Sequence, residues 1–311
     1  MIAFGPIPSR RLGRSMGINN IPPKICSYSC VYCQVGRTTE LQIDRRSFYE
    51  PGEILRSARD KVRRALAIGE RVDYLTFAPD GEPTLDVNLS REIDLLRPLG
   101  IKIAVITNSS LIWRKDVRRD LMRADWVSLK LDSTQGETWG RINRPHGRLV
   151  MNEILAGALE FAGAFRGKLV TETMLVEGLN DGSAHLEGLA SFLARLQPEV
   201  AYLSIPIRPP AEAWARPPEE GVINQAYQIL SEQLDQVECL TGYEGNAFAF
   251  TGDVESDLLS ITAVHPMREE AVGELLARAG SEWAIVDKLV VQGCLVETEY
   301  AGRRFYVRKL L

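Results

Sequence analysis

Residues 24–37 read KICSYSCVYCQVGR and place Cys26, Cys30 and Cys33 at C-x3-C-x2-C spacing, so that three thiolates can converge from one loop onto one inorganic centre. The chain has five cysteines, an odd number, and the crowding of three of them does not resemble a disulfide framework. In a reducing compartment such a group is more often a metal site. The other two, Cys239 and Cys294, lie far apart in apolar surroundings and are most simply buried thiols.

Several kinds of metal site compete for this motif. A structural zinc site needs four Cys or His ligands at close range, whereas His146, His185 and His265 lie far downstream and follow no zinc-finger spacing. A ferredoxin-like electron carrier would need a fourth cysteine nearby. Three cysteines around four irons leave one iron open, which implies that something else binds there. A purely structural metal site that stabilises the loop stays a further alternative.

Around this motif, short apolar runs alternate with stretches of helical period. The runs predict strands at 16–19, 73–78, 101–107, 126–131, 169–176 and 201–207. The helical stretches lie at 53–68, 91–97, 115–123, 152–165, 185–196 and 222–236. Six strand–helix units in sequence predict an α/β protein with a parallel sheet and helices outside it.

The two-residue period of each strand separates a face toward a barrel interior from a face packed on helices. Ser128, Lys130 and Asp132 are expected to share the interior face. Polar residues repeat this arrangement in other strands, at Tyr74, Thr76 and Asp80, at Thr171 and Thr173, and at Tyr202, Ser204 and Arg208. A closed eight-stranded barrel fills its interior with branched apolar side chains, so a polar interior predicts an open, partial (β/α)6 barrel around a polar ligand. Strand edges that touch water would also explain part of the pattern.

The pattern changes near residue 254. Two helical segments, 268–279 and 282–292, precede strands at 295–300 and 304–308 around an Ala301-Gly302 turn, which predicts a small α+β, winged-helix-like domain. We therefore expect a barrel domain at 1–240, a linker at 241–253 and the small domain at 254–311. From residue 268 onward there are seven basic and seven acidic side chains, whereas nucleic-acid modules generally carry a basic surplus. Binding of a protein or peptide, or packing on the barrel, is at least as good an expectation.

The overall composition is that of a globular protein, with 45% hydrophobic and 25% charged residues. The net charge of -4 argues against a surface that binds nucleic acid or anionic membrane as a whole, although a local basic patch is compatible with it. The first residues lack the apolar core of a signal peptide, and no stretch approaches the length of a membrane span. These features predict a cytoplasmic protein without a membrane partner.

The three cysteines, with Tyr32 before the last, resemble the signature of the radical S-adenosylmethionine (SAM) superfamily. Residues 5–36, GPIPSRRLGRSMGINNIPPKICSYSCVYCQVG, resemble the branch of iron–sulfur oxidoreductases that includes the tRNA wyosine-synthesis enzymes, and the resemblance covers residues 4–208. It implies that Cys26, Cys30 and Cys33 hold a [4Fe–4S] cluster whose open iron chelates SAM. An electron from the reduced cluster then releases a 5′-deoxyadenosyl radical, which abstracts hydrogen from a substrate.

The same resemblance implies a set of cofactor-binding residues. The backbone around Tyr32 would face the adenine, and the turn Asp80-Gly81-Glu82-Pro83 resembles the G-G-E-P turn that receives the methionine amino group, with Asp80 in place of the first glycine. The remaining candidates are Thr107, Asn108 and Ser109 for the ribose or carboxylate, Lys130, Asp132 and Thr173 in the interior, and Leu203 or Ile205 near the adenine. Each has a structural alternative, because Gly, Pro, Asn and Ser mark turns and strand ends, and Lys130 and Asp132 can simply pair with each other.

The expected function is that of a radical SAM enzyme with an unidentified RNA nucleoside, peptide or protein substrate, and no catalytic residue is assigned. Arg10, Arg11, Arg14, Arg141 and Arg144 can form a positive mouth for an anionic substrate or simply lie in solvent. The resemblance implies reduced flavodoxin or ferredoxin as the electron donor. The alternative is a non-catalytic iron–sulfur redox sensor that acts through its winged-helix domain.

Overall fold

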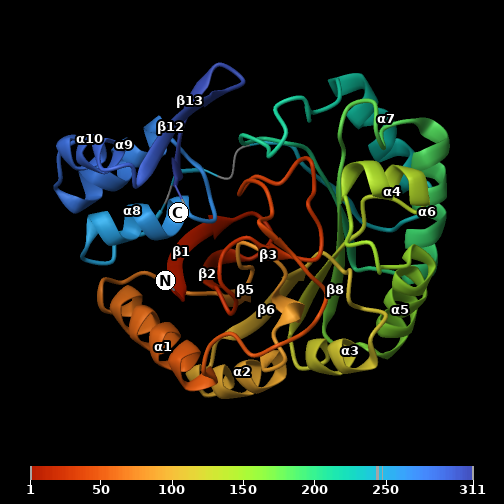
Figure 1. Cartoon of the computed structure of the whole chain (residues 1–311), viewed down its shortest axis with the longest axis horizontal. Coiled ribbons are helices and arrows are strands. Elements are labelled where there is room, and N and C mark those ends of the chain that lie inside the picture. Colours follow the sequence, from red (N-terminus) through yellow and green to blue (C-terminus); the bar gives the residue numbers. More distant parts are fainter. Residues whose placement is uncertain (1, 243–244, 247, 310–311) are drawn as a thin grey trace.

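An eight-stranded sheet runs through the middle of the computed structural model, which describes residues 2–242, 245–246 and 248–309. The strand order is β1-β2-β5-β6-β7-β8-β9-β10, and every pair is parallel except the antiparallel pair β1–β2 at one edge. The sheet curls into an open half-barrel (Figure 1). Its strands are β1 (Ala3–Ser9), β2 (Gly13–Ile18), β5 (Tyr74–Phe77), β6 (Lys102–Thr107), β7 (Trp126–Lys130), β8 (Lys168–Met174), β9 (Val200–Ser204) and β10 (Val237–Leu240).

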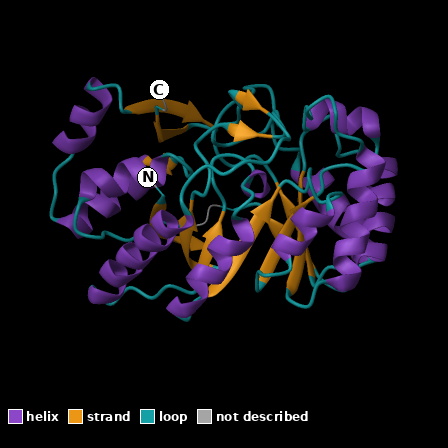
Figure 2. Cartoon of the chain, turned by 60° about the horizontal axis from the view of Figure 1, so that its bottom comes forward, coloured by secondary structure: helices purple, strands orange, loops and turns teal. Residues whose placement is uncertain are grey.

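Helices lie along the outer side of this sheet (Figure 2). In α1, for example, Ile54, Ala58, Val62 and Ala65 recur at helical spacing and are buried, so that one face of the helix packs on the sheet. A proline at the first helical position, Pro51, starts this helix without losing a backbone hydrogen bond. The helices are α1 (Pro51–Ala67), α2 (Leu89–Leu96), α3 (Lys115–Leu121), α4 (Gly136–Ile142), α5 (Met151–Ala164), α6 (Ser183–Leu196) and α7 (Glu220–Ser231).

The expected α/β class and partial barrel are confirmed. The six expected strands are β2 and β5 to β9, and the six expected helices are α1, α2, α3, α5, α6 and α7. Among the half-barrel strands and helices given above, three lack a clear signal in the sequence. β1 contains Pro6 and Pro8, which are tolerated because the strand lies at a sheet edge; β10 buries only Leu240; and α4 buries only Ile142.

The register of β8 corrects the expected position of two threonines. Lys130 pairs with Glu172, so Glu172 shares the interior face with Lys130. Thr171 pairs with Leu129, and Thr173 pairs with Leu203; both leucines belong to the core between sheet and helices. The interior position expected for Thr171 and Thr173 is therefore wrong. The pattern was ambiguous because 171–173 are all polar, and β-branched Thr is accommodated on a buried strand face.

The C-terminal part contains α8 (Val254–Thr262), α9 (Glu269–Ala279) and α10 (Ala284–Val291), with a three-stranded sheet of order β11-β13-β12. Its strands are β11 (Met267–Arg268), β12 (Leu295–Tyr300) and β13 (Arg303–Arg308). Ala301 and Gly302 both have positive φ, as a two-residue hairpin turn requires. The two expected helices and the hairpin are present, with α8 and β11 in addition. The domain boundaries and the winged-helix character stay predictions.

This C-terminal part packs beside β1 and α1 (Figure 1). Its own apolar core, which includes Phe248, Leu258 and Leu275, also contacts Ile7 of β1. A buried ion pair joins Lys61 of α1 to Asp257 of α8, with 2.7 Å between Nζ and Oδ1. Across the described ranges, no helix combines the length and the apolar character needed to traverse a lipid bilayer.

Candidate functional site

The three motif cysteines line one pocket of about 320 Å³ inside the half-barrel. They belong to a loop that begins at the short strand β3 (Ile25–Cys26), which pairs with β4 (Glu40–Leu41). Backbone hydrogen bonds tie the loop to the C-terminal end of α4, from Val31 N–H to the Ile142 carbonyl and from Ser29 N–H to the Asn143 carbonyl just after it. The loop therefore has a fixed backbone, which lets the three side chains face the same space.

Two amide side chains donate to the sulfur atoms. Asn108 Nδ2 lies 3.4 Å from Cys26 Sγ, and Asn143 Nδ2 lies 3.4 Å from Cys30 Sγ. Burial raises the pKa of the Cys26 thiol well above its usual value, and burial together with the Asp132 carboxylate raises the pKa of Cys30 to about 12. A metal centre bound by these sulfur atoms would supply the positive charge that favours their thiolate form.

The donor set fits a multi-iron cluster better than a single ion. Within 2–242, 245–246 and 248–309, no group of three or more His, Cys, Asp or Glu side chains is arranged to hold one metal ion. A cluster binds each thiolate through a different iron, so its ligands need not meet at one atom. Cys239 and Cys294 are half-buried and lie outside the pocket. The three pocket cysteines are thus the residues that could hold a [4Fe–4S] cluster.

The turn after β5 lies directly against the cysteine loop. Gly81 lines the pocket, and a Cβ at Gly81 would lie 2.1 Å from the Ile25 carbonyl oxygen. Asp80, which replaces a glycine of the family pattern, pairs with Lys24 at 2.8 Å. Burial raises the pKa of Asp80 to about 6, against the opposing effect of Lys24. Asp80 therefore ties this turn to Lys24, next to the cysteine loop, by an ion pair.

Glu82 is buried behind the pocket. Its carboxylate accepts hydrogen bonds from Thr84 N–H, Thr107 Oγ1 and Asn108 N–H, at 3.0, 2.7 and 2.7 Å. The structure thus places Glu82 and Thr107 in a network that fixes the strand ends, whereas the Asn108 side chain reaches the pocket. Ser109 is buried, has φ of 66° and is absent from the pocket lining.

Asp132 positions Tyr32. The Tyr32 hydroxyl donates to Asp132, which also accepts from Asn143 Nδ2 at 2.7 Å and from Met174 N–H at 2.8 Å. Burial raises the pKa of Asp132, against the opposing effect of Lys130. Tyr32 lines the pocket while Asp132 lies behind it. Thr173 also lies outside the pocket lining, and its hydroxyl donates to the Leu131 carbonyl at 2.7 Å.

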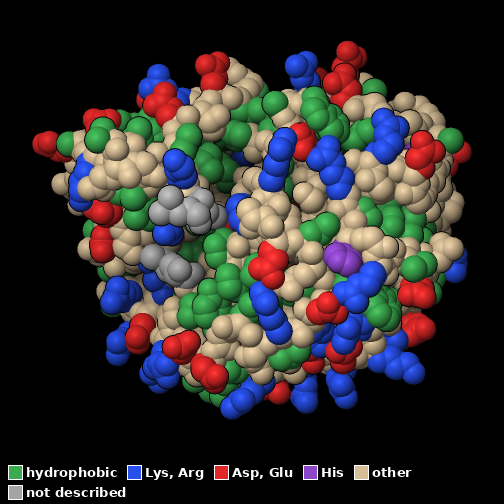
Figure 3. Space-filling view, viewed as in Figure 1, with side chains coloured by type: hydrophobic (Ala, Val, Ile, Leu, Met, Phe, Trp, Pro, Cys, Tyr) green, Lys and Arg blue, Asp and Glu red, His purple; other side chains and the backbone are tan. Residues whose placement is uncertain are grey.

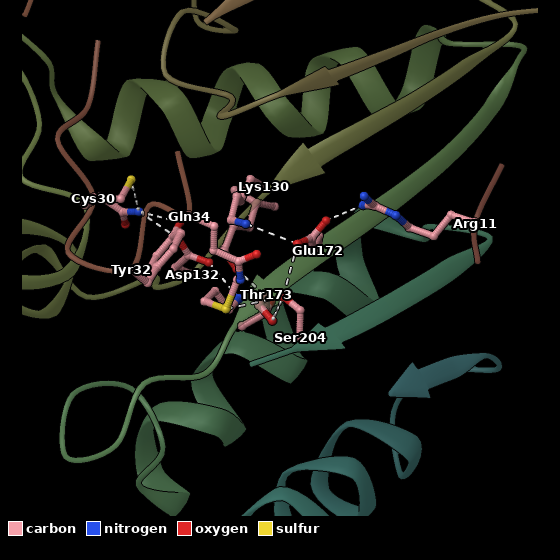
Figure 4. Close-up of polar contacts among 12 residues, drawn as sticks. Arg11, Cys30, Tyr32, Gln34, Lys130, Asp132, Glu172, Thr173 and Ser204 are labelled. Carbon is pink, nitrogen blue, oxygen red and sulfur yellow. Dashed lines mark hydrogen bonds and ion pairs between the residues drawn. The ribbon is translucent and has the colours of Figure 1, made fainter. Parts of the chain in front are cut away.

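The alternative interpretation of the sequence paired Lys130 with Asp132. In the structure, Lys130 pairs with Glu172 instead. Its Nζ lies 3.1 Å from Glu172 Oε1 and 4.8 Å from the centre of the Tyr32 ring. Glu172 also pairs with Arg11 and accepts from Ser204 Oγ at 3.0 Å (Figure 4). Although burial alone would raise the pKa of Glu172, Arg11 and then Lys130 hold it well below its usual range.

Glu172 and Ser204 also line the pocket. The sequence did not identify Glu172, because it lies between two polar threonines and the alternation of apolar and polar residues does not show which face of the strand it occupies. Glu172 could have been identified from the pairing of β7 with β8, in which it lies opposite Lys130. Ile205 lines the pocket, but Leu203 lies in the outer core.

The arginines expected at the mouth divide into two groups. Arg10 and Arg11 line the pocket together with Arg208. Arg14 instead pairs with Glu70, and Arg144 pairs with Glu212, each at 2.6 Å. Of the arginines in the lining, Arg11 pairs with Glu172. After β7, Arg144 is paired with an acid and Arg141 is exposed, so neither lines the pocket.

Comparisons with known proteins agree with this geometry. The family model of the radical SAM superfamily matches residues 20–192. The chain is 48% identical over 311 residues to UPF0026 protein MJ1312 of Methanocaldococcus jannaschii, with 99% of this chain and 96% of that protein covered.

Two solved structures share the fold. A structure of TYW1 with a lysine-pyruvate adduct bound aligns with a TM-score of 0.55 and 17% identity, over 71% of this chain and 74% of that one. Streptococcus suis SuiB bound to precursor peptide SuiA aligns with a TM-score of 0.52 and 12% identity, over 72% and 48%. Members of the matched family use a [4Fe–4S] cluster and SAM, the cofactors that the cysteine motif implies. The chain therefore belongs to the radical SAM superfamily.

Proposed function

We propose that this chain holds a [4Fe–4S] cluster through Cys26, Cys30 and Cys33, cleaves SAM reductively there and passes the radical to a substrate at the pocket mouth. The observation that supports this most directly is the shared pocket of the three cysteines with Tyr32, Gly81, Asn108 and Lys130. These residues lie at or beyond the ends of different parallel strands, from β2 to β7. Barrel enzymes gather their reactive groups at such strand ends.

When bound, the cluster and SAM supply one electron and a sulfonium C–S bond, whose cleavage gives methionine and a 5′-deoxyadenosyl radical that abstracts hydrogen from the substrate. The protein contributes positions. Asn108 and Asn143 donate to cysteine sulfur, which stabilises the thiolate form. Lys130 is held between Glu172 and the Tyr32 ring. Its ammonium group therefore has a fixed position from which it can bind an anionic part of the ligand.

The remaining cofactor-binding residues are proposed in two classes. Tyr32, Gly81, Asn108 and Lys130 are proposed to contact SAM, because they line the pocket. Glu82, Thr107, Ser109, Asp132 and Thr173 are proposed to support it indirectly, because they lie behind the lining residues.

We propose reduced flavodoxin or ferredoxin as the electron donor and an RNA nucleoside, a peptide or a protein as the substrate. The resemblance of residues 5–36 to the branch with the tRNA wyosine-synthesis enzymes supports the first substrate class, and the similarity in fold to SuiB with its precursor peptide supports the second.

The test is anaerobic reconstitution with iron and sulfide, reduction with dithionite in the presence of SAM, and chromatographic detection of 5′-deoxyadenosine. We expect wild type and Cys239→Ala, whose native thiol lies outside the pocket, to form 5′-deoxyadenosine. Cys30→Ala should form none and should bind less iron. Wild-type protein that carries four irons yet gives no 5′-deoxyadenosine would contradict the proposal.

A further inference from the structure

A second hollow, of about 730 Å³, lies between the loop after β9 and the β12–β13 hairpin. We call it the hairpin groove. One wall is formed by Pro206, Ile207 and the prolines of 209–217, and the other by 298–301. Ile207 also lines the cysteine pocket, so the two hollows lie on either side of this residue.

The hairpin presents an unpaired strand edge to this groove. In the sheet of order β11-β13-β12, β12 is an edge strand, and within the described residues it pairs only with β13. In a two-residue hairpin the closing pair, here Tyr300 and Arg303, exchanges backbone hydrogen bonds, and the bonded pairs then alternate. The backbone N–H and C=O groups of Glu297 and Glu299 therefore point away from β13. Such an edge is a template for another extended chain.

The opposite wall leaves space for that chain. Prolines have no backbone N–H, so the segment around Pro209 and Pro210 is poorly suited to pair with β12 itself. The Tyr300 hydroxyl donates to the Pro206 carbonyl at 3.0 Å, which ties the tip of the hairpin to the loop after β9. This contact fixes the hairpin against one wall of the groove.

The charges of the hairpin favour a peptide over a nucleic acid. The groove itself is lined by two basic side chains, Arg216 and Arg268, and two acidic ones, Glu177 and Glu299. Elsewhere on the hairpin, Arg304 pairs with Glu269 and Glu297, and Arg303 pairs with Glu270. Basic and acidic side chains are interspersed on the face shown in Figure 3. Phosphate binding depends on uncompensated Lys and Arg, whereas an extended peptide needs backbone groups and shallow apolar walls.

We propose that the hairpin groove binds an extended peptide segment of a protein substrate as an added strand beside β12, and so directs one residue of that segment to the pocket. This inference rests on the proposed radical SAM activity for its purpose, but binding itself does not require catalysis. Backbone hydrogen bonds at Glu299, which lines the groove, and at Glu297, the next outward-facing position of the same strand, give the affinity, and the apolar walls select the side chains.

The test separates backbone from side-chain contacts at one position. Glu299→Pro removes the outward N–H and should leave the β12–β13 ladder intact, because that N–H does not face β13. Glu299→Ala removes the charge and keeps the N–H. Peptides selected on the full-length protein from a random dodecapeptide display library serve as probes, with fluorescence anisotropy to measure affinity. Unmodified total tRNA is the competing probe.

We expect selected peptides to bind wild type and Glu299→Ala within about twofold of each other and to bind Glu299→Pro at least tenfold more weakly. Hydrogen exchange on wild type needs no variant, and we expect bound peptide to protect the amides of Glu297 and Glu299. The inference is overturned if no peptide is enriched, if Glu299→Pro binds as well as wild type without protection of these amides, or if only tRNA binds. Because 5′-deoxyadenosine formation is measured separately, failure of peptide binding alone leaves the proposed activity standing.

Discussion

At the scale of single residues, Glu172 balances the positive charges of Arg11 and Lys130 in the pocket. Its carboxylate lies between Arg11 and Lys130, and only about a tenth of its side chain is exposed. Without Glu172, two cations would face each other in a partly desolvated space, which costs free energy. With it, Lys130 is held over Tyr32, beside the cysteine loop.

We therefore predict that Glu172→Gln lowers the free energy of unfolding at pH 7 by on the order of 3 kcal/mol, the usual cost of breaking a buried ion pair. An acid whose folded pKa is lowered stabilises the protein above its unfolded pKa, about 4.3 for Glu, and this contribution is lost as pH falls toward the folded pKa. The difference in the free energy of unfolding between Glu172→Gln and wild type should thus shrink below about pH 4. Urea unfolding at pH 7 and at pH 3.5 measures both. Glu187→Gln, at an exposed site on α6, is the control, and equal stability of Glu172→Gln and wild type at pH 7 would refute the prediction.

Glu92 of α2 shows the opposite electrostatic case. Its side chain is fully buried near Asp86, and no Lys or Arg of the described residues forms an ion pair with it. Burial, and then the Asp86 carboxylate, raise the pKa of Glu92. The folded protein therefore keeps a proton that the unfolded chain releases above about pH 4.3.

We predict that the contribution of Glu92 to wild-type stability falls as pH rises from about 5 to 8, by up to about 1.4 kcal/mol per pH unit for one such proton. Glu92→Gln carries no proton to release and should flatten this slope, whereas the exposed Glu187→Gln should retain it. Urea unfolding at pH 5, 6.5 and 8 gives the three slopes. Parallel slopes for wild type and Glu92→Gln would show that Glu92 is not the group responsible.

At the scale of elements, two turns define the site by backbone contact. The Gly81 turn after β5 meets the cysteine loop at Ile25, where the Glu82 N–H donates to the Ile25 carbonyl at 3.2 Å. The backbone at Gly81 has no space for an added side chain at this point, so the close approach of the two segments depends on the absence of a Cβ at Gly81.

Gly81→Ala should therefore displace the cysteine loop. An alanine Cβ would lie 2.1 Å from a backbone oxygen that cannot rotate away, and overpacking of this kind costs about 1–3 kcal/mol. We expect less iron per chain after reconstitution and a lower melting temperature. Gly163→Ala, in α5 with open space around its Cβ, should keep full iron content. Normal iron content in Gly81→Ala would contradict the contact.

The sequence predicts most elements because their periodicity is strong, and it fails where tertiary context decides. The six parallel strands have apolar runs of their own, whereas β10 reads VECL and is recognised only by its pairing with β9. The cysteine spacing identifies three residues of the pocket directly. Glu172 and Arg11 could not be paired in advance, because 161 positions separate them and a register shift of one residue would turn Glu172 to the other face.

At the scale of the whole molecule, the C-terminal part helps to enclose the site. Val264, which follows α8, lines the cysteine pocket, and Tyr300 contacts the loop after β9. The placement of α8 against the barrel rests in part on Lys61, whose Nζ contacts both Asp257 and Thr251 Oγ1. The side chains of Lys61 and Asp257 are only 10% and 2% exposed.

A double-mutant cycle tests whether this buried pair holds α8 in place. Lys61→Met leaves Asp257 buried without its cation, and Asp257→Asn leaves Lys61 buried without its anion, so each should lower the free energy of unfolding by about 3–5 kcal/mol. Lys61→Met with Asp257→Asn removes both charges and should be more stable than the sum of the single changes predicts, by on the order of 2 kcal/mol.

The control is the Lys288–Glu255 pair, which also involves α8 but is 52% and 41% exposed, so that its loss should cost less than about 1 kcal/mol. Urea unfolding gives the energies, and hydrogen exchange at 254–262 shows whether α8 loosens. Because Val264 follows α8 directly, Lys61→Met should also reduce 5′-deoxyadenosine formation, while Lys288→Met should not. Equal coupling in the two pairs, or unchanged exchange in α8, would mean that apolar packing alone positions the C-terminal part over the pocket.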